Sequence, residues 1–339
     1  DQVHLIASYV APLYTGGKLR NSILASKEGL EAKKQKLESD TDKTVLSAAE
    51  SYLLSLLTKA LLDVNTEALE TVKKHKEQAE IAYETGTAAK YDVIRAESAV
   101  KDREGKLYEA KANHESALMA LKTLLNIDKA EEIELTDSLG FPAPDSDAET
   151  LIQRAENNNP GLKALSKKIK ASEFLKKAES GSRMPQFSAI AAGQLVTGNI
   201  NKIEPEWLFG VNMTFNIFDG GITGAKIDEA EHKIAAARLE KENAGSYLEL
   251  GIRSALLRLE AAQKSLEAAQ AAVALAREAL RLAERRFETG NGTGIEVLDA
   301  QTALTSAEAA EKNALYKGEM IDLEIKSYCG LLRNNKENL

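Results

Sequence analysis

One internal repeat constrains this chain more than any other feature of its sequence. The tripeptide Glu-Thr-Gly ends at Gly86 and again at Gly290, and a Gly-Gly pair begins at Gly16 and again at Gly220. Both intervals are 204 residues long. A register kept over the whole arm between the two features indicates two copies of one structural unit.

Each copy reads as a strand, a Gly-Gly pair, a long helix, a short tip that contains glycine, and a return helix. The tips are YETGTAAKYDV at 83–93 and FETGNGTGIEV at 287–297. Between the copies, Asn159 is a good helix cap and Pro160 suits a first helical turn, so a helix is expected from about 160 to 180. The predicted division is a first repeat at 1–126, a connector at 127–159, a second repeat at 160–330 and a tail at 331–339.

The long arms carry heptads. In the second copy, large apolar residues recur every seven positions from Ile252 to Phe287 and alternate with alanines, which let helix backbones approach closely. A second apolar line, which includes Leu257, Leu275 and Leu282, predicts neighbours on more than one side. No proline interrupts the first arm, so its rod should be about 100 Å long. Taken alone, such heptads also fit a soluble coiled-coil scaffold.

Alternating strands change this interpretation. Residues 207–217 place Trp, Phe, Val, Met, Phe and Ile on one face, 3–13 repeat the pattern, and a strand at 187–197 should pair with 207–217 through the loop GNINKIEPE. Strands of about ten residues with one apolar face can cross a bilayer at a tilt. The edge of a soluble sandwich is the alternative, but the helical remainder offers no second sheet.

A sheet in lipid must close on itself, and the few strands of one chain cannot do so. The sequence therefore predicts an oligomer in which several chains contribute strands to one β-barrel and helices to one bundle. The strand-to-helix joints would use the dihedral freedom of glycine, with a tight turn before a capped helix as the simpler alternative. The joint residues are Gly16, Gly17, Gly220 and Gly221.

The remaining features exclude other classes of function. A net charge of −8 argues against a general nucleic-acid binder. No nucleotide loop or metal-ligand spacing occurs, so neither an enzyme nor a cofactor or metal site is predicted. The histidines are scattered (His4, His75, His114 and His232).

The sequence contains no run of about 18 apolar residues, so it predicts no transmembrane helix. The chain opens directly as a strand, and we expect its natural N-terminus to lie upstream.

The order and spacing of these motifs resemble the TolC-like outer-membrane efflux protein family, over nearly the whole chain. The resemblance rests on the paired repeats, on the strand that leads through FDGG into a long helix, on the tip of Phe287 to Gly290 followed by Val297 to Ala300, and on the Asn-Pro-Gly-Leu helix start. The family also has a helix and a strand before the position of Asp1, equivalent to about 160–198 of the second half. Their absence suggests a truncated chain.

The resemblance implies a mainly α fold in which antiparallel coiled-coil hairpins form a trimeric α-barrel, continued by a transmembrane β-barrel with strands from each chain. The homotrimer would sit in the outer membrane of a Gram-negative bacterium, with a tunnel through the periplasm and an equatorial belt at the connector. It implies a passive exit duct of a tripartite efflux or type I secretion system, opened by a periplasmic adaptor protein and an inner-membrane efflux pump or ABC transporter.

Functional residues follow from the resemblance by position. The tips would close the periplasmic end and receive the adaptor beside Gly86, Thr87, Gly290 and Asn291. Glu296 and Asp299, three residues apart on one helix face, match the acidic gate, and Asp92 is equivalent to Glu296 across the repeat. In a trimer, stacked carboxylate rings would favour cations. An ordinary solvated helix face is the alternative.

The sequence departs from the family at two gate positions, because Phe287 and Gly292 stand where some relatives place a tyrosine and an arginine. The closed state is therefore expected to have fewer polar links. The cargo stays open, since drugs, metal ions and secreted polypeptides all leave through such ducts. An adaptor protein, a further alternative, would need additional domains for which the repeat leaves no room.

Overall fold

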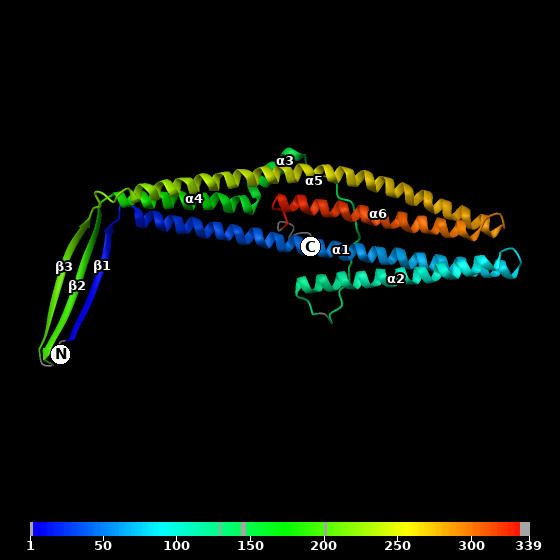
Figure 1. The fold of residues 1–339 in the computed structure, drawn as a ribbon, viewed down its shortest axis with the longest axis horizontal. Coiled ribbons are helices and arrows are strands. Elements are labelled where there is room, and N and C mark those ends of the chain that lie inside the picture. The colour runs from blue at the N-terminus through cyan, green and yellow to red at the C-terminus, as the bar shows by residue number, and fades with distance from the viewer. Residues whose placement is uncertain (1–2, 129, 144–146, 200–201, 333–339) are drawn as a thin grey trace. The chain divides into compact units, whose positions relative to one another are not determined.

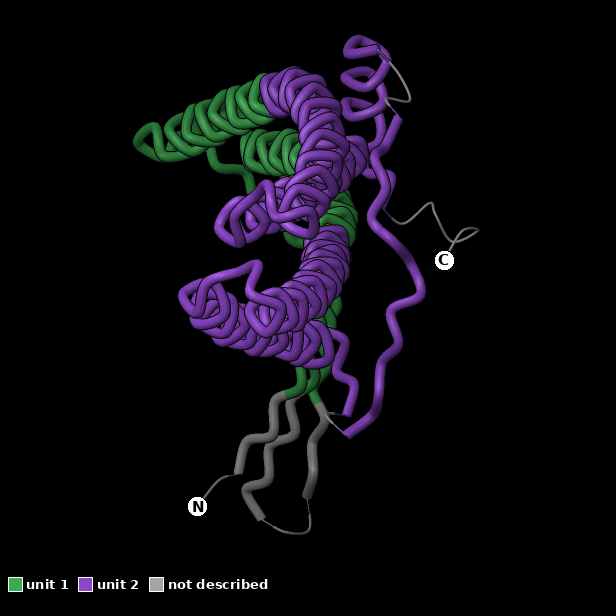
Figure 2. The backbone as a smooth tube through the Cα atoms, turned by 90° about the vertical axis from the view of Figure 1, so that its right-hand side faces the viewer, with its two compact units in different colours: residues 1–39, 159–247 green, residues 40–158, 248–339 purple. Residues whose placement is uncertain are grey.

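The computed structural model describes residues 3–128, 130–143, 147–199 and 202–332. The chain divides into two compact units (Figure 2). Unit 1 comprises residues 1–39 and 159–247, and unit 2 comprises residues 40–158 and 248–339. The two units do not coincide with the two predicted repeats. Each of the two long helices begins in unit 1 and ends in unit 2.

Two helices of 67 residues, α1 (Lys18–Glu84) and α5 (Ile222–Glu288), account for much of the chain (Figure 1). The first residues of the two helices are 204 positions apart, and so are their last residues. The interval between the repeated glycines therefore also separates the helix boundaries. At 1.5 Å per residue, each is about 100 Å long. The predicted long arms are confirmed.

In unit 2, each long helix returns on itself as a hairpin, with α2 (Lys90–Leu125) beside α1 and α6 (Gly294–Tyr328) beside α5 (Figure 1). Most of the predicted heptad positions of α5 are buried, and three of its alanines are half-buried. The buried residues are Ile252, Ala255, Leu259, Ala262, Leu266, Val273, Leu280 and Phe287, and the half-buried ones are Ala269, Ala276 and Ala283. The second apolar line of α5 is exposed on the single chain, and it includes Leu257 and Leu275.

The connector packs along unit 2 as an extended chain that ends in α3 (Ala148–Asn158). Leu135 is buried with Leu53 of α1 and Leu121 of α2, and α6 side chains pack against the same cluster. The Tyr52 hydroxyl donates a hydrogen bond of 2.6 Å to Asp137, and burial raises the pKa of Tyr52 to about 12, aided by that contact. The connector thus joins elements of both hairpins.

The sheet of unit 1 has strands β1 (Val3–Tyr14), β2 (Gln186–Asn199) and β3 (Lys202–Thr214), in the order β1-β2-β3 and antiparallel throughout. The predicted pairing of the last two is confirmed. The predicted nine-residue loop between them is wrong, because both strands extend into it, and β3 stops at Thr214 before residues 215–217. Pro205 lies inside β3, paired with Leu195, at an edge of the described sheet.

Helix α4 (Pro160–Ser180) confirms the expected helix start, since the Asn159 side chain accepts a hydrogen bond from the Leu162 N–H at 3.2 Å. Ion pairs attach α4 to the parts of α1 and α5 within unit 1. They join Lys167 to Glu28 at 3.0 Å, Lys176 to Glu231 at 2.9 Å and Glu173 to Arg238 at 2.7 Å. A short 3-10 turn, η1 (Gly181–Arg183), leads from α4 toward β2.

Both Gly-Gly pairs lie between a strand and a helix, and all four glycines have positive φ, from 62° to 88°. A Cβ on Gly16 would lie 2.3 Å from the Gly181 carbonyl oxygen, so this position also needs glycine for close approach. Each following helix is capped at the equivalent position. Thr15 Oγ1 accepts from Leu19 N–H at 3.1 Å, and Asp219 accepts from Thr223 N–H at 2.8 Å.

By length and composition alone, α1 contains an 18-residue window of mean hydropathy 1.4 that could cross a membrane. The window holds at most two charged residues, and 17% of it is buried within the chain. Leu53 and Leu56 of α1 are buried against the connector and α2 within unit 2.

Candidate functional site

The two hairpin tips have the same backbone conformation. At the first tip, Thr87 N–H donates to the Ala82 carbonyl at 2.8 Å and Gly86 N–H donates to Tyr83 at 3.1 Å. At the second, Asn291 donates to Arg286 at 2.9 Å and Gly290 to Phe287 at 3.0 Å. This is the Schellman arrangement, in which a left-handed residue ends a helix and its carbonyls are satisfied.

The left-handed residue is Gly86 in one tip and Gly290 in the other, with φ of 79° and 72°. A Cβ on either would meet no atom within 4 Å, so the glycine is required by φ and not by crowding. Thr87 and Asn291, the residues that follow, are exposed. The four residues named for docking therefore lie at the accessible ends of the hairpins.

A shared core lies just behind the tips and joins α1, α2, α5 and α6 within unit 2. Its buried members are Ala79 of α1, Val93 and Ala96 of α2, Leu280 and Phe287 of α5, and Val297 of α6. Phe287 contributes its ring to this core. Separation of the two hairpins at their tips would expose these side chains to water.

The three candidate gate carboxylates have different surroundings. Asp92 Oδ2 accepts a hydrogen bond from the Ala89 N–H at 3.1 Å and so caps the start of α2. Glu296 Oε2 forms an ion pair with Arg286 Nη1 at 3.3 Å. Asp299 is exposed, and no ion pair of its side chain is seen among the described residues. Of the three, Asp299 has the least compensated charge.

His75 is the residue that the sequence analysis did not assign to the site. It is 2% exposed, and its ring meets the Phe287 ring edge-on with centroids 5.0 Å apart. A Cβ on Gly294 would lie 3.5 Å from both His75 Nε2 and Asp92 Oδ1, so the three residues converge. The sequence signal was available, because His75 keeps heptad spacing with the buried residues Val72 and Ala79.

Two polar contacts farther along the helices also link the hairpins. The buried Arg103 of α2 donates to Thr302 Oγ1 of α6 at 3.0 Å. The buried Gln301 of α6 donates to the Thr71 carbonyl of α1 at 3.5 Å, while its Oε1 has no hydrogen-bond partner in the described structure. Both contacts would break if the hairpins separated along their length.

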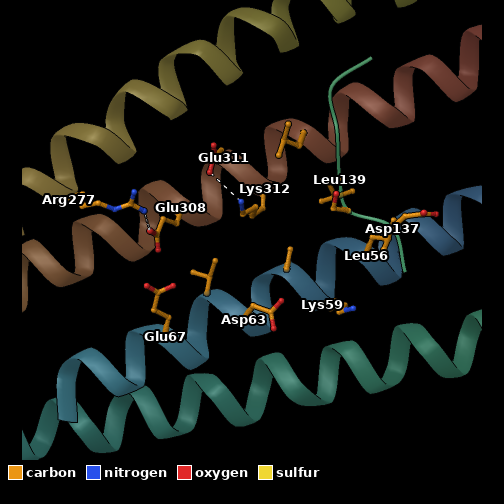
Figure 3. A pocket seen from close by; sticks show the side chains of 14 residues that line it. Leu56, Lys59, Asp63, Glu67, Asp137, Leu139, Arg277, Glu308, Glu311 and Lys312 are labelled. Atoms are coloured by element: carbon orange, nitrogen blue, oxygen red, sulfur yellow. Dashed lines mark hydrogen bonds and ion pairs between the residues drawn. The ribbon is translucent and has the colours of Figure 1, made fainter. Parts of the chain in front are cut away.

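A cavity of about 500 Å³ lies between α1, α6 and the connector (Figure 3). Arg277 of α5 reaches Glu308 at 3.0 Å, and Lys312 pairs with Glu311 at 3.4 Å. The Lys59 ammonium donates to the Leu135 carbonyl of the connector at 2.9 Å. Asp63 and Glu67 also line the wall, and no ion pair of either is seen among the described residues, so the α1 side of the cavity is acidic.

The described residues contain no group of three or more His, Cys, Asp or Glu side chains that could hold a metal ion. Cys329 is a free, buried thiol whose Sγ lies 3.6 Å from the Leu151 carbonyl oxygen. Burial raises the pKa of this thiol, so it is a packed core group and not an activated nucleophile.

Comparison with known proteins decides the family. The sequence model of the family described as outer membrane efflux protein matches residues 1–126 and 151–328. The chain belongs to this family. The predicted family is thereby confirmed.

Curated relatives are similar over most of the chain. The outer membrane efflux protein BepC of Brucella suis biovar 1 is 24% identical to this chain. The matched region covers 88% of this chain and 65% of the length of BepC. The toluene efflux pump outer membrane protein TtgC of Pseudomonas putida is 26% identical over 90% of this chain and 63% of its own length.

Among solved structures, CusC, described in terms of folding and transmembrane channel formation, matches with a TM-score of 0.82 at 19% identity. The match covers 97% of this chain and 77% of the CusC chain. At this identity the likeness shows the fold alone. The mainly helical, TolC-like fold predicted from the sequence is confirmed.

Proposed function

We propose that this chain is one subunit of an outer-membrane exit duct, a passive conduit for an efflux or type I secretion system in a Gram-negative bacterium. The observation that carries the proposal is the apolar face of β3. Trp207, Phe209 and Val211 alternate along the strand and are each 69–74% exposed. Large apolar side chains left in water at every second position are unfavourable, and lipid removes that penalty.

The same reasoning supports a homotrimer with one shared barrel and one helical tunnel. The described sheet has three strands and two free edges, which hydrocarbon does not tolerate. On α5, the exposed leucines Leu257 and Leu275 offer an apolar line for a neighbouring subunit. The connector at 127–159 would then form a belt around the tunnel, and the repeats at 1–126 and 160–330 would each supply strands and one hairpin.

Extraction and conductance test the duct. The full-length protein should leave cell membranes only with detergent, should have the mass of a trimer and should give discrete conductance steps in a planar bilayer. A water-soluble, monomeric full-length protein without conductance would instead support the soluble coiled-coil scaffold. That alternative leaves the exposed apolar row of β3 without a role.

The tips are the proposed docking site for a periplasmic adaptor, which would couple the duct to an inner-membrane pump. Gly86, Thr87, Gly290 and Asn291 are exposed and held by rigid caps. Thr87→Cys and Asn291→Cys should cross-link to the adaptor in cells. Met119→Cys, on an exposed position of α2 about 40 Å from the tip by helix rise, is the matched control and should not.

The acidic gate is proposed as a cation-selective ring at the tips, formed by Glu296 and Asp299 with Asp92 behind them. Because Arg286 already pairs with Glu296, Asp299 should contribute more to selectivity. We expect Asp299→Asn to reduce the cation preference of the conductance more than Glu296→Gln does, and the double variant to reduce it most. Unchanged selectivity in the double variant would remove both residues from the gate.

A further inference from the structure

Four helices meet around one buried histidine. His75 projects from α1 into the tip core, where α5 contributes Phe287 and α6 contributes Gly294. Among the described residues, the charged group that faces the ring across these elements is Asp92 of α2, near Nε2. Both ring nitrogens are buried without a hydrogen-bond partner in the described structure.

A buried imidazole without partners is an unusual choice for a packed core. Leucine or phenylalanine would fill the space without the free-energy cost of burying polar atoms that lack a hydrogen bond. The position equivalent to His75 in the second copy is Ala279, so the repeat itself does not demand a histidine. The ring therefore adds a property that packing alone does not need.

That property is titration. We propose that His75 makes the contact between the two hairpin tips sensitive to acid: the neutral ring holds the tips together, and protonation favours their separation. The inference deepens the proposed gate and concerns the same tips. Protonation acts here because a charged imidazolium in the core between α1 and α5 is unfavourable, whereas separated tips would give it water.

The sign follows from the two states. Burial lowers the pKa of His75 in the packed tips, while the Asp92 charge opposes this shift only in part. The Gly294 backbone lies near the ring but makes no hydrogen bond of acceptable geometry with it. In separated tips the ring would be solvated, with the ordinary pKa of about 6.5. As the pH falls through that range, the separated state takes up the proton first, so acid shifts the equilibrium toward it. Well above that range both states are neutral and pH has no effect through His75.

The size of the effect is bounded by one proton per chain. The ratio of separated to packed tips can rise at most about tenfold for each pH unit. It stops rising once the packed ring is also protonated. A steeper response would require further groups or coupling between chains.

Hydrogen exchange tests the inference without relying on conductance. In the full-length protein in detergent, protection factors of amides near His75 and Phe287, corrected for intrinsic exchange, should fall between pH 8 and pH 5. His75→Phe keeps a ring against Phe287 and should abolish the fall. His75→Gln, which is polar but does not titrate, should abolish it as well, even if its baseline protection is lower.

The control is His232→Gln, which removes an exposed histidine of unit 1 and should leave the pH response intact. A pH response that persists in both His75 variants would overturn the proposal, and so would its absence from the unmodified protein. In planar bilayers, acid should open the duct in the unmodified protein and not in His75→Phe. Loss of conductance at every pH would count against the duct itself, while the exchange result would still decide the role of His75.

Discussion

The two hairpin tips have the same backbone but different supports. Phe287 is buried in the tip core, whereas its equivalent Tyr83 is 44% exposed. Arg286 braces the second tip through Glu296 and the Asn291 carbonyl, whereas its equivalent in the first tip is Ala82. The repeated sequence specifies the turn, and the unrepeated side chains make the tips unequal.

The middle of the long helices shows the same inequality. Leu53 of α1 is 8% exposed because the connector and α2 cover it, whereas its equivalent Leu257 of α5 is 68% exposed. Among the described residues, the chain covers this position of α1 and leaves the equivalent position of α5 exposed. We infer that the uncovered line of α5 is where a second subunit packs, so the asymmetry within one chain is what allows association between chains.

Truncating the aromatic ring at each tip should give the largest difference. Phe287→Ala removes a buried ring and should destabilise the tip core by about 3–5 kcal/mol. Tyr83→Ala removes an exposed ring whose specific contact is the Lys90 ammonium, 5.2 Å from its centroid, and should cost under about 1 kcal/mol. Free energies of local opening from hydrogen exchange would measure both.

Phe287→Leu is the matched control for that comparison, because it keeps an apolar side chain of smaller volume and should lose less than the alanine variant. Equal losses from Phe287→Ala and Tyr83→Ala would mean that the tips are supported alike. The inequality of their cores would then be wrong.

Replacing the turn glycine should instead destabilise both tips by the same amount. Gly86→Ala and Gly290→Ala should each cost about 1 kcal/mol, since both positions have positive φ and open space around the new Cβ. Gly290→Asn should cost less, because asparagine tolerates the left-handed region. Thermal unfolding of the full-length protein would rank these variants, and a loss at one tip alone would contradict the shared turn conformation.

The sequence predicted what depends on periodicity and on special backbone angles. The interval of 204 residues placed the ends of α1 and α5, and the Gly-Gly pairs predicted the turns between strand and helix. The strand boundaries were harder to predict from the sequence. The polar stretch before Trp207 reads as a loop, but pairing with β2 keeps residues from Lys202 onward in the strand.

His75 shows why the site itself was harder to predict. Its partners are 17 to more than 200 residues away in the chain, at Asp92, Phe287 and Gly294. Single-sequence reasoning treats a lone histidine as unremarkable, because neither heptad spacing nor composition says which helices will meet at that level. The ion pair of Arg286 with Glu296 was also not predicted. It joins residues on either side of one turn, and the sequence alone does not say which side chains face each other there.

The smallest expected effect comes from removing the brace of the second tip. Arg286→Ala gives this tip the residue of the first, and it breaks a mostly exposed ion pair and a hydrogen bond to the Asn291 carbonyl at 3.1 Å. We expect a loss of about 0.2–1 kcal/mol, measured as faster exchange of the Asn291 amide at low salt. About 1 M salt should shrink the difference, because screening then acts within about 3 Å. Since alanine stands at the equivalent position of the first tip, exchange of the Thr87 amide should change neither with salt nor with the substitution. If Asn291 kept its protection in Arg286→Ala, the Schellman turn alone would hold both tips, and the difference between them would lie only in the core around Phe287.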